Sequence, residues 1–341
     1  MPGIIGIVSI FLATAMLTGV FRHYALKKGM MDVPNNRSSH VVATPRGGGI
    51  AVVIVFLSVL FFYLTDNAIN IDSRYIASLF LGGATIAAVG FWDDHQHVPA
   101  SWRSAIHLVA AFASLLVIPS LPVINLFGYN LNLGWLAYPV YAIAIVWLLN
   151  LYNFMDGIDG IASVQAISVS GGAALILLLQ GQQTWAELLF LLSVCVAGFL
   201  VWNWPPAKVF MGDACSGFLG FILGLLLVIT SAEGSINLWS WIILLGVFWL
   251  DATVTLVRRI FRGEKFYEAH RSHAYQRLSR RWQSHKKVTL SVLAINTLWL
   301  LPWALAATFV PTYSLLIFFV ALTPLAYLIL MLGAGKGDLE A

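Results

Sequence analysis

The chain has 341 residues, of which 60% are hydrophobic and only 10% are Asp, Glu, Lys or Arg, with a formal net charge of +4. Average soluble domains carry about 25% charged residues, so this composition excludes an ordinary soluble protein and indicates a membrane protein. The two cysteines, Cys195 and Cys215, lie in or beside different apolar segments, so they provide neither a disulfide framework nor a paired metal motif.

Long apolar segments recur along the chain, at lengths suited to helices that cross a bilayer, which need roughly 20 residues. Regular alternation of apolar and polar residues is absent, which argues against a membrane barrel. We therefore predict an all-α, polytopic membrane protein that forms a single domain over residues 1–341. The eleven expected transmembrane helices are centred on residues 4–21, 48–64, 76–92, 105–121, 135–151, 161–180, 185–202, 215–231, 237–257, 288–309 and 313–333.

The first span resembles a signal peptide, but its apolar stretch is too long and no basic residue precedes it. Its positive charges, Arg22, Lys27 and Lys28, follow it, which predicts a periplasmic N-terminus and a cytoplasmic C-terminus. This threading leaves Arg74 as the one residue outside among the 19 Lys and Arg. The resulting basic cytoplasmic face favours anionic lipid headgroups and phosphorylated ligands, and nucleic acid is not an expected partner.

The polar sequence is concentrated in cytoplasmic segments, the longest of which is an expected basic loop over residues 258–287. The first segment contains Arg46, followed by Gly47, Gly48 and Gly49. A glycine run permits close approach of the backbone, and an arginine beside it can meet a phosphate. Because a P-loop lysine pattern is missing, a turn-rich connector is the favoured interpretation. The segments are residues 23–47, 93–103, 153–160, 203–214 and 258–287.

Asp93 and Asp94 end the third span. Two adjacent carboxylates repel each other, and a bound divalent cation is a natural way to keep both ionised. Oxygen ligands suit Mg²⁺, which usually keeps several waters and shares the phosphates of a substrate. The alternative is a solvated helix end, which accounts for one aspartate more readily than for two.

Asn153, Asp156 and Asp159 repeat at three-residue spacing, with Gly157 and Gly160 between and after them. If this segment is helical, the spacing places the polar groups on one face, and the glycines allow a ligand near the backbone. An ordinary polar turn between two spans is the alternative. A turn does not require a single polar stripe, so a functional site is favoured.

Asn203 closes the seventh span, and Asp213 opens the eighth after a proline-containing loop. Asp213 is positioned to cap the eighth span, with Ser216 three residues later. The N-terminus of a helix is also a site for anions, so capping and binding of a metal and phosphate can coexist at Asp213.

The final loop contains His270, Arg271 and His273, and later His285. The spacing of the first two histidines resembles that of zinc ligands, but the Glu that follows the first His in a zincin is missing. Contact with phosphate or nucleotide is the preferred functional interpretation, and solvated loop histidines are the alternative.

Together these motifs resemble the polyprenyl-phosphate N-acetylhexosamine-1-phosphate transferase family, and the resemblance runs from Asp32 to His285. The translocase branch of that family, which acts on MurNAc-pentapeptide, has consecutive histidines where this chain has His-Arg-Ser-His. The start of the second cytoplasmic segment, Asp-His-Gln-His, is also unusual. The chain is therefore more similar to the branch that initiates O-antigen on undecaprenyl phosphate. The corresponding motifs are Asp93-Asp94, residues 153–160, Asn203, residues 210–213, and more loosely His270 and His273.

The resemblance implies that an N-acetylated sugar-1-phosphate moves from a UDP-sugar to undecaprenyl phosphate, releasing UMP, in the bacterial inner membrane. It implies Mg²⁺ as cofactor, with Mn²⁺ as a possible substitute, and it is compatible with a homodimer. The sugar, GlcNAc or a 6-deoxy N-acetylsugar, and the choice of single or double displacement stay open. The implied roles are Asp93 or Asp94 as base, Asp213 and Asp156 at the metal, Asp159 and His273 as further catalytic residues, and Asn153, Asn203, Arg46, Arg103, His270 and Arg271 at the substrates.

An ion-coupled secondary transporter is the competing interpretation, because acidic residues in membranes also couple ion and substrate movement. Transporter sites usually lie at the midplane on broken helices. Here the aspartates lie at the ends of expected spans, which favours the transferase. A CDP-alcohol phosphotransferase would need an Arg after the Asp-Gly-x-Ala sequence at Asp159, and the chain lacks it.

Overall fold

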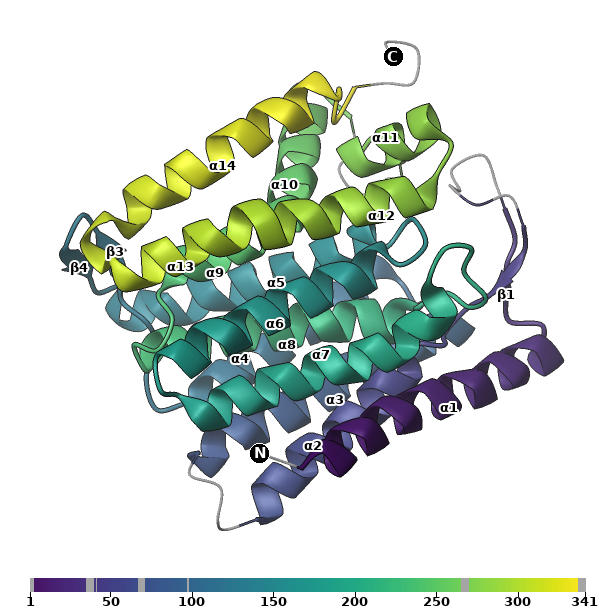
Figure 1. The fold of residues 1–341 in the computed structure, drawn as a ribbon, viewed down its shortest axis with the longest axis horizontal. Coiled ribbons are helices and arrows are strands. Elements are labelled where there is room, and N and C mark those ends of the chain that lie inside the picture. Colours follow the sequence, from purple (N-terminus) through teal and green to yellow (C-terminus); the bar gives the residue numbers. More distant parts are fainter. Residues whose placement is uncertain are drawn as a thin grey trace.

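The computed structural model describes residues 3–34, 40, 42–66, 71–96, 98–264 and 270–336. Helices make up most of this part of the chain, and the long ones run roughly in one direction as a bundle (Figure 1). Strands occur as two short antiparallel pairs, β1 with β2 and β3 with β4. The all-α, polytopic membrane fold is confirmed. His97, in the unusual start of the second cytoplasmic segment, lies outside the described residues.

The elements follow one another in the order α1 (Ile4–Lys28), β1 (Met31–Asp32), β2 (Thr44–Pro45), α2 (Ile50–Thr65), α3 (Ser73–His95), α4 (Ala100–Val117), β3 (Ile124–Leu126), β4 (Tyr129–Leu131), η1 (Gly134–Leu136), α5 (Ala137–Met155), α6 (Ile161–Leu179), α7 (Gln183–Asn203), α8 (Asp213–Ala232), α9 (Leu238–Leu244), α10 (Gly246–Phe261), α11 (Ala274–Trp282), α12 (His285–Ala294), η2 (Ile295–Leu300), α13 (Leu301–Phe309), η3 (Pro311–Tyr313) and α14 (Ser314–Met331).

Within the described residues, nine helical segments are long and apolar enough to cross a bilayer, or ten if the bent pair α9 and α10 is counted as one span. That pair, expected as one helix over residues 237–257, is bent by 80° at Leu245. α2 is apolar but has only 16 residues, fewer than the roughly 20 that a straight span needs. Each of the eleven expected segments is therefore helical, but these two are not full-length straight spans.

α8 lies at the centre of the bundle, where α3 and α5 pack along it. Its side chains are apolar around most of the circumference, and Phe218, Phe221 and Ile222 are fully buried. A helix with apolar residues on every face is expected in an interior. The first residue of α8, Asp213, is thereby held inside the bundle at one of its ends.

The two ends of the bundle differ in sequence and structure (Figure 1). The β3–β4 hairpin lies at one end, and the β1–β2 pair lies at the other, where α1 ends and α2 begins. The first turn of α1 and the last turn of α14 lie at opposite ends (Figure 1). This arrangement is compatible with termini on opposite sides of a membrane, and the assignment of sides stays a prediction.

Residues 258–287 were expected to form one long basic loop, but much of this segment is helical. α10 continues to Phe261, a separate helix α11 spans Ala274–Trp282, and α12 begins at His285. α11 forms because His273 and Gln276 make a capping box at its start and because the carboxylate of Asp251 accepts hydrogen bonds from its first amides. An interpretation based on charge alone reveals neither the local capping box nor the tertiary contacts of Asp251.

Candidate active site

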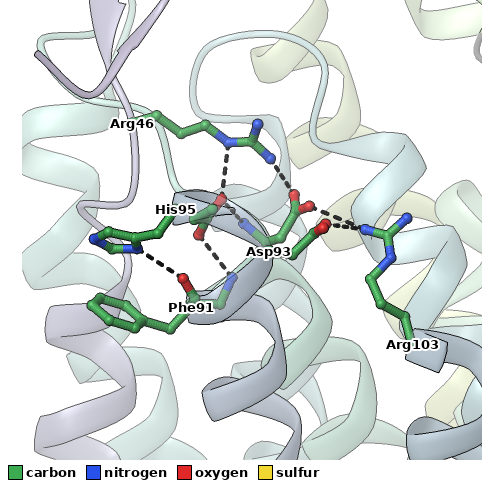
Figure 2. Close-up of polar contacts among 8 residues, drawn as sticks. Arg46, Phe91, Asp93, His95 and Arg103 are labelled. Atoms are coloured by element: carbon green, nitrogen blue, oxygen red, sulfur yellow. Dashed lines mark hydrogen bonds and ion pairs between the residues drawn. The ribbon is translucent and has the colours of Figure 1, made fainter. Parts of the chain in front are cut away.

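Arg46 lies between two aspartates at the end of the bundle that carries β1 and β2 (Figure 2). Its Nε is 3.1 Å from Asp94 Oδ1, and its Nη2 forms an ion pair and hydrogen bond with Asp213 Oδ1. Burial by itself would lower the pKa of Arg46, but Asp213 and Asp94 together raise it above its ordinary value. Arg46 is therefore a permanent cation, brought to the carboxylates by the β1–β2 pair.

The glycines after Arg46 pack against the chain that precedes α8. The amides of Gly48 and Gly49 donate to the carbonyls of Phe210 and Met211, both at 3.0 Å. These donors are already paired, so the run does not form a phosphate loop. The connector interpretation is correct, and its structural role is to align Arg46 with the start of α8.

Asp94 caps α8 from a neighbouring helix. Its Oδ1 accepts from the amide of Asp213 at 3.0 Å, and its Oδ2 accepts from the amide of Ala214 at 3.2 Å. The residue before α8, Gly212, has φ +83° and provides no side-chain cap. A side chain at Gly90 would meet the backbone of Asp213 and Ala214 at about 2.6 Å, so this glycine permits the close approach of α3.

The expectation that Asp213 itself caps α8 is therefore wrong. Asp213 is the first residue of the helix, and its carboxylate turns to Arg46 and Arg103, whose Nη1 is 3.6 Å from Asp213 Oδ2. Asp94, from another part of the sequence, performs the capping that had been assigned to Asp213. The carboxylate of Asp213 is thus available to bind other groups without the helix losing its cap.

Asp93 has different partners from Asp94. Its Oδ1 accepts from the amide of Val98 at 2.9 Å, and its Oδ2 forms an ion pair with Arg103 on α4. Figure 2 shows the guanidinium groups of Arg46 and Arg103 on either side of the carboxylates. Each member of the adjacent pair thus has an ion pair with an arginine of its own.

The segment after α5 is a turn, and not the single polar helical face expected for residues 153–160. α5 ends at Met155, Asp156 follows as its C-cap, and α6 starts after Gly160, which has φ +74°. The turn nevertheless directs Asn153, Asp156 and Asp159 to one cavity. The expected grouping of these polar side chains is correct, although the helical geometry that motivated it is wrong.

Asp156 and Asp159 differ in their contacts. Asp159 Oδ2 accepts from the amide of Ala207 at 3.1 Å, and Asp159 Oδ1 is 3.2 Å from His285 Nδ1. In the described part of the chain, no hydrogen-bond donor or ion-pair partner reaches the carboxylate of Asp156. Burial raises the pKa of Asp156 well above its ordinary value, and Arg46 lowers it only in part.

A polar cavity of about 210 Å³ joins these groups. Arg46 and Asp213 lie on one side of it, and the turn after α5 lies on another. Its acidic and basic groups suit a charged, water-soluble ligand. The lining residues are Asp32, His40, Arg46, Asn153, Asp156, Gly157, Ile158, Asp159, Asn203, Phe210, Gly212, Asp213, Gln276 and His285.

An amphipathic cavity of about 410 Å³ adjoins the same aspartate. Asn153 and Asp213 line both cavities, whereas Asp93 and Arg103 line the amphipathic one. Its apolar wall comes mainly from spans, which suits a ligand with a charged head and an apolar body. The lining residues are Ile86, Gly90, Asp93, Ala100, Arg103, Ser104, His107, Trp147, Leu149, Asn150, Asn153, Phe154, Asp213, Gly217 and Leu256.

Asn203 lines the polar cavity but is extensively engaged within the protein. Its Oδ1 accepts from the amide of Gly160 at 3.1 Å and from the hydroxyl of Ser163 at 3.2 Å. Its Nδ2 donates to the carbonyl of Val209 at 3.1 Å. These bonds tie the start of α6 to the loop before α8, so the observed contacts of Asn203 are those of a positioning residue.

The structure does not bring the His-rich segment to either cavity. His270, Arg271 and His273 are absent from the described lining of both, and His273 is buried as the cap of α11, 3.6 Å from Asp251. Burial, together with the nearby His273 and Arg259, lowers the pKa of His270 to about 3, so its ring is neutral near pH 7. The catalytic role of His273 and the substrate contacts of His270 and Arg271 stay predictions without a contact in this geometry that supports them.

Three residues outside the set of site residues that the resemblance implies line the polar cavity or support the elements around it. His285 contacts Asp159, and Gln276 of α11 lines the polar cavity. Asp251, an isolated aspartate inside an apolar segment, is 2% exposed and holds the start of α11. Its position within an expected span was the available signal, because a charged residue in a span usually has a structural or functional partner.

The carboxylates fit a Mg²⁺ ion. Mg²⁺ is usually held by one or two protein carboxylates, together with waters and substrate phosphates. Asp156 is partly buried, has no donor or ion-pair partner among the described residues, and shares the polar cavity with Asp213, so these two could supply the protein ligands. No group of three His, Cys, Asp or Glu positioned for a metal occurs among the described residues. The remaining ligands would then be water and substrate oxygens.

Known proteins are similar in sequence to most of this chain. Residues 76–231 match the model of the family described as glycosyl transferase family 4. The chain is 30% identical over 303 residues to the probable undecaprenyl-phosphate N-acetylglucosaminyl 1-phosphate transferase of Bacillus subtilis (strain 168), covering 84% of this chain and 79% of that protein.

Two further relatives belong to two types of transferase. The undecaprenyl-phosphate alpha-N-acetylglucosaminyl 1-phosphate transferase of Salmonella typhi is 28% identical, over 80% of this chain and 76% of that one. The phospho-N-acetylmuramoyl-pentapeptide-transferase of Prochlorococcus marinus (strain MIT 9301) is 30% identical, but over only 63% and 62% of the two chains. The similarity thus extends further along the chain for the N-acetylglucosaminyl 1-phosphate transferases than for the pentapeptide transferase.

Proposed function

Because the chain belongs to glycosyl transferase family 4, the family of the polyprenyl-phosphate N-acetylhexosamine-1-phosphate transferases, we propose that it transfers an N-acetylated sugar-1-phosphate from a UDP-sugar to undecaprenyl phosphate. The products are undecaprenyl-diphosphate-sugar and UMP. The names of its relatives support undecaprenyl phosphate as the acceptor and an N-acetylglucosaminyl group as the first sugar to test. The product would begin O-antigen and lipopolysaccharide synthesis at the cytoplasmic face of the bacterial inner membrane.

The observation that carries this proposal is the position of Asp213 between two cavities of different character. The polar cavity suits the nucleotide diphosphate, and the amphipathic cavity suits a phosphate attached to a polyprenyl chain. An enzyme that joins a water-soluble donor to a lipid acceptor requires such a meeting point. Arg46 and Arg103 contact Asp213 from the two sides and would approach the two phosphate groups.

In the proposed reaction, a phosphate oxygen of the lipid attacks the phosphorus of the sugar-1-phosphate group. A new P–O bond forms, and the bond to the bridging oxygen of UMP breaks, so the charge leaves with UMP. When bound by Asp156 and Asp213, Mg²⁺ would neutralise the diphosphate and the departing UMP. The protein's own contribution is to align the two phosphates and surround them with Arg46 and Arg103.

Asp93 is the favoured base of the adjacent pair. It lines the amphipathic cavity, where the lipid phosphate is expected, whereas both oxygens of Asp94 accept amides of α8. A phosphate monoester has its second pKa near 6, so removal of a proton contributes modestly at pH 7. Asp94 is then a positioning residue. An alternative double displacement would use an aspartate as nucleophile and release UMP before the lipid binds.

The test is one assay with purified protein, undecaprenyl phosphate, Mg²⁺ and a panel of UDP-sugars, with UMP release and the lipid product as readouts. We expect UMP only when lipid and an N-acetylated UDP-sugar are both present. Release of UMP without lipid would favour the double displacement. Absence of UMP and of lipid product with every sugar would overturn the proposed function.

A further inference from the structure

A second charged cavity, of about 460 Å³, lies between α11 and the end of α14. Figure 1 shows these two helices near each other at the end of the bundle that carries the site. We propose that this basic cavity binds the phosphate-bearing head group of an anionic phospholipid, independently of the transfer reaction. Its lining residues are Arg277, Leu278, Arg280, Arg281, Met331, Leu332, Gly333 and Lys336.

The charge of the basic cavity points to an anion. Three arginines and one lysine line it, and none of the described lining residues is acidic. Arg277 Nη1 donates to the carbonyl of Lys336 at 3.1 Å, and Arg280 Nη1 donates to the carbonyl of Arg271 at 3.0 Å. A carbonyl acceptor orients the guanidinium group of Arg277 without cancelling its charge. The like charges of Arg277, Arg281 and Lys336 repel one another across the cavity, and a bound phosphate would relieve that repulsion.

The position of the basic cavity points to a lipid as the source of the phosphate. Met331 is the last residue of α14, which belongs to an apolar segment long enough to span a bilayer, Pro311–Met331. The cavity therefore lies where the bilayer core meets water. Met331 is 69% exposed, and Leu278 and Leu332 line the same cavity, so apolar surface adjoins the cations. Basic pockets at the ends of spans are suited to anionic head groups.

The basic cavity is separate from the site of the reaction. None of its lining residues lines the polar or the amphipathic cavity. The donor and acceptor phosphates already have candidate cations in Arg46 and Arg103. The basic residues of this cavity therefore lie outside the two cavities assigned to the reaction, at the boundary of the membrane.

Binding is tested by native mass spectrometry of the purified full-length protein, titrated with phosphatidylglycerol or phosphatidylcholine. The test variant is Arg281→Gln with Lys336→Gln, which removes two of the four charges. The matched control is Lys27→Gln with Lys28→Gln, two exposed lysines at the end of α1 on the same side of the bundle. We expect phosphatidylglycerol to bind roughly 30-fold more weakly to the test variant and nearly unchanged to the control.

A variant that fails to fold is recognised by its melting temperature, and Lys336→Gln alone then replaces it, with an expected loss of roughly fivefold. Equal losses of binding in the test and control variants would overturn the proposal. The lipid would then respond to the overall positive charge of the protein and not to this cavity. Equal binding of phosphatidylcholine to the unaltered protein would also overturn it.

Two further measurements separate the lipid from other anions. A 100-fold excess of inorganic phosphate should leave phosphatidylglycerol bound, and complete displacement by it would show a site for free phosphate instead. The acidic residues Asp338 and Glu340 follow the cavity in sequence, outside the described residues. Lipid binding that appeared only after deletion of residues 337–341 would overturn the proposal, because the intact chain would then not bind the lipid.

Discussion

Two pairs of aspartates meet at one end of the bundle, and their surroundings differ. The pair at the end of α3 is engaged by protein groups: Arg103 and a loop amide hold Asp93, and Arg46 and the first amides of α8 hold Asp94. In the turn after α5, Asp159 is engaged in a similar way. Asp156 lies partly buried beside it, without a donor in the described structure.

The difference shows how one cluster of like charges serves two purposes. A partly buried carboxylate without a partner raises the free energy of the folded protein, and such groups are concentrated at sites where a ligand binds. The engaged pair has its partners already and holds α3, α4 and α8 in register. We therefore assign the α3 pair mainly to the framework and the acceptor side, and Asp156 with Asp213 to the metal and the donor.

The assignment of the two aspartate pairs to the acceptor and the donor requires both pairs to lie on the cytoplasmic side of the membrane. We expect a cysteine at Lys286→Cys to react with an impermeant maleimide only in opened cells, because α12 begins at the expected cytoplasmic end. Arg74→Cys, at the other end of the bundle, should react in intact cells. The native Cys195 and Cys215 are buried and should contribute little background. Labelling of Lys286→Cys in intact cells would place the site on the outer side of the membrane, where a cytoplasmic UDP-sugar could not reach it.

The largest effect on activity is expected at Asp213, which links the two pairs. Asp213→Asn should lower UMP release by about 100- to 1,000-fold at saturating Mg²⁺. The variant loses the negative charge that would hold Mg²⁺ at the diphosphate. Its melting temperature should change little, since Asp94 supplies the cap of α8. Near-normal turnover of this variant would refute the metal role.

The pH–rate profile should separate Asp93 from Asp156. Asp93→Asn should be about tenfold slower relative to the unaltered protein at pH 5 than at pH 8, because the lipid phosphate loses its proton unaided above pH 6. Asp156→Asn should respond instead to the concentrations of Mg²⁺ and UDP-sugar. If an aspartate forms a covalent intermediate, its Asn variant will not recover at any pH. Identical profiles for the two variants would show that this division of roles is wrong.

Stability should distinguish Asp94 as a helix cap. Asp94→Ala removes the acceptor of two amides at the start of α8 and should cost about 1–3 kcal/mol in the free energy of unfolding. Asp94→Asn keeps one acceptor oxygen and should cost less. Denaturant unfolding of the two variants provides the measurement. Equal stability of Asp94→Ala and the unaltered protein would contradict the capping role.

The smallest effect is expected from Asp156 in the metal-free protein. Its pKa is raised by burial, so the folded state holds the proton more tightly than the unfolded state does. The contribution of Asp156 to stability is then highest below about pH 4 and falls as the pH rises toward the raised pKa. Asp156→Asn should remove this dependence and gain roughly 1 kcal/mol at pH 7 without Mg²⁺. Free energies of unfolding that coincide for the two proteins from pH 4 to 8 would argue against a raised pKa of Asp156.

Much of the fold was accessible from the sequence, because the length of an apolar run directly sets whether a helix can cross a bilayer. The break at Leu245 was not accessible, since both α9 and α10 are apolar and no proline or charge marks the bend. The short helix α11 was also missed. Its start depends on Asp251, more than 20 residues away, and a basic composition alone is equally compatible with a loop.

For the site, the sequence by itself determined which residues gather, because aspartates at the ends of spans on one side of a membrane must lie at one surface. The tertiary structure decided what each of them contacts. It assigned the cap of α8 to Asp94, paired Arg46 and Arg103 with the aspartates, placed His285 at Asp159 and left Asp156 without a partner. These contacts join residues separated by up to about 170 positions, and they exist only once the apolar faces of α3, α5 and α8 have packed. Local patterns in the sequence therefore do not predict these contacts.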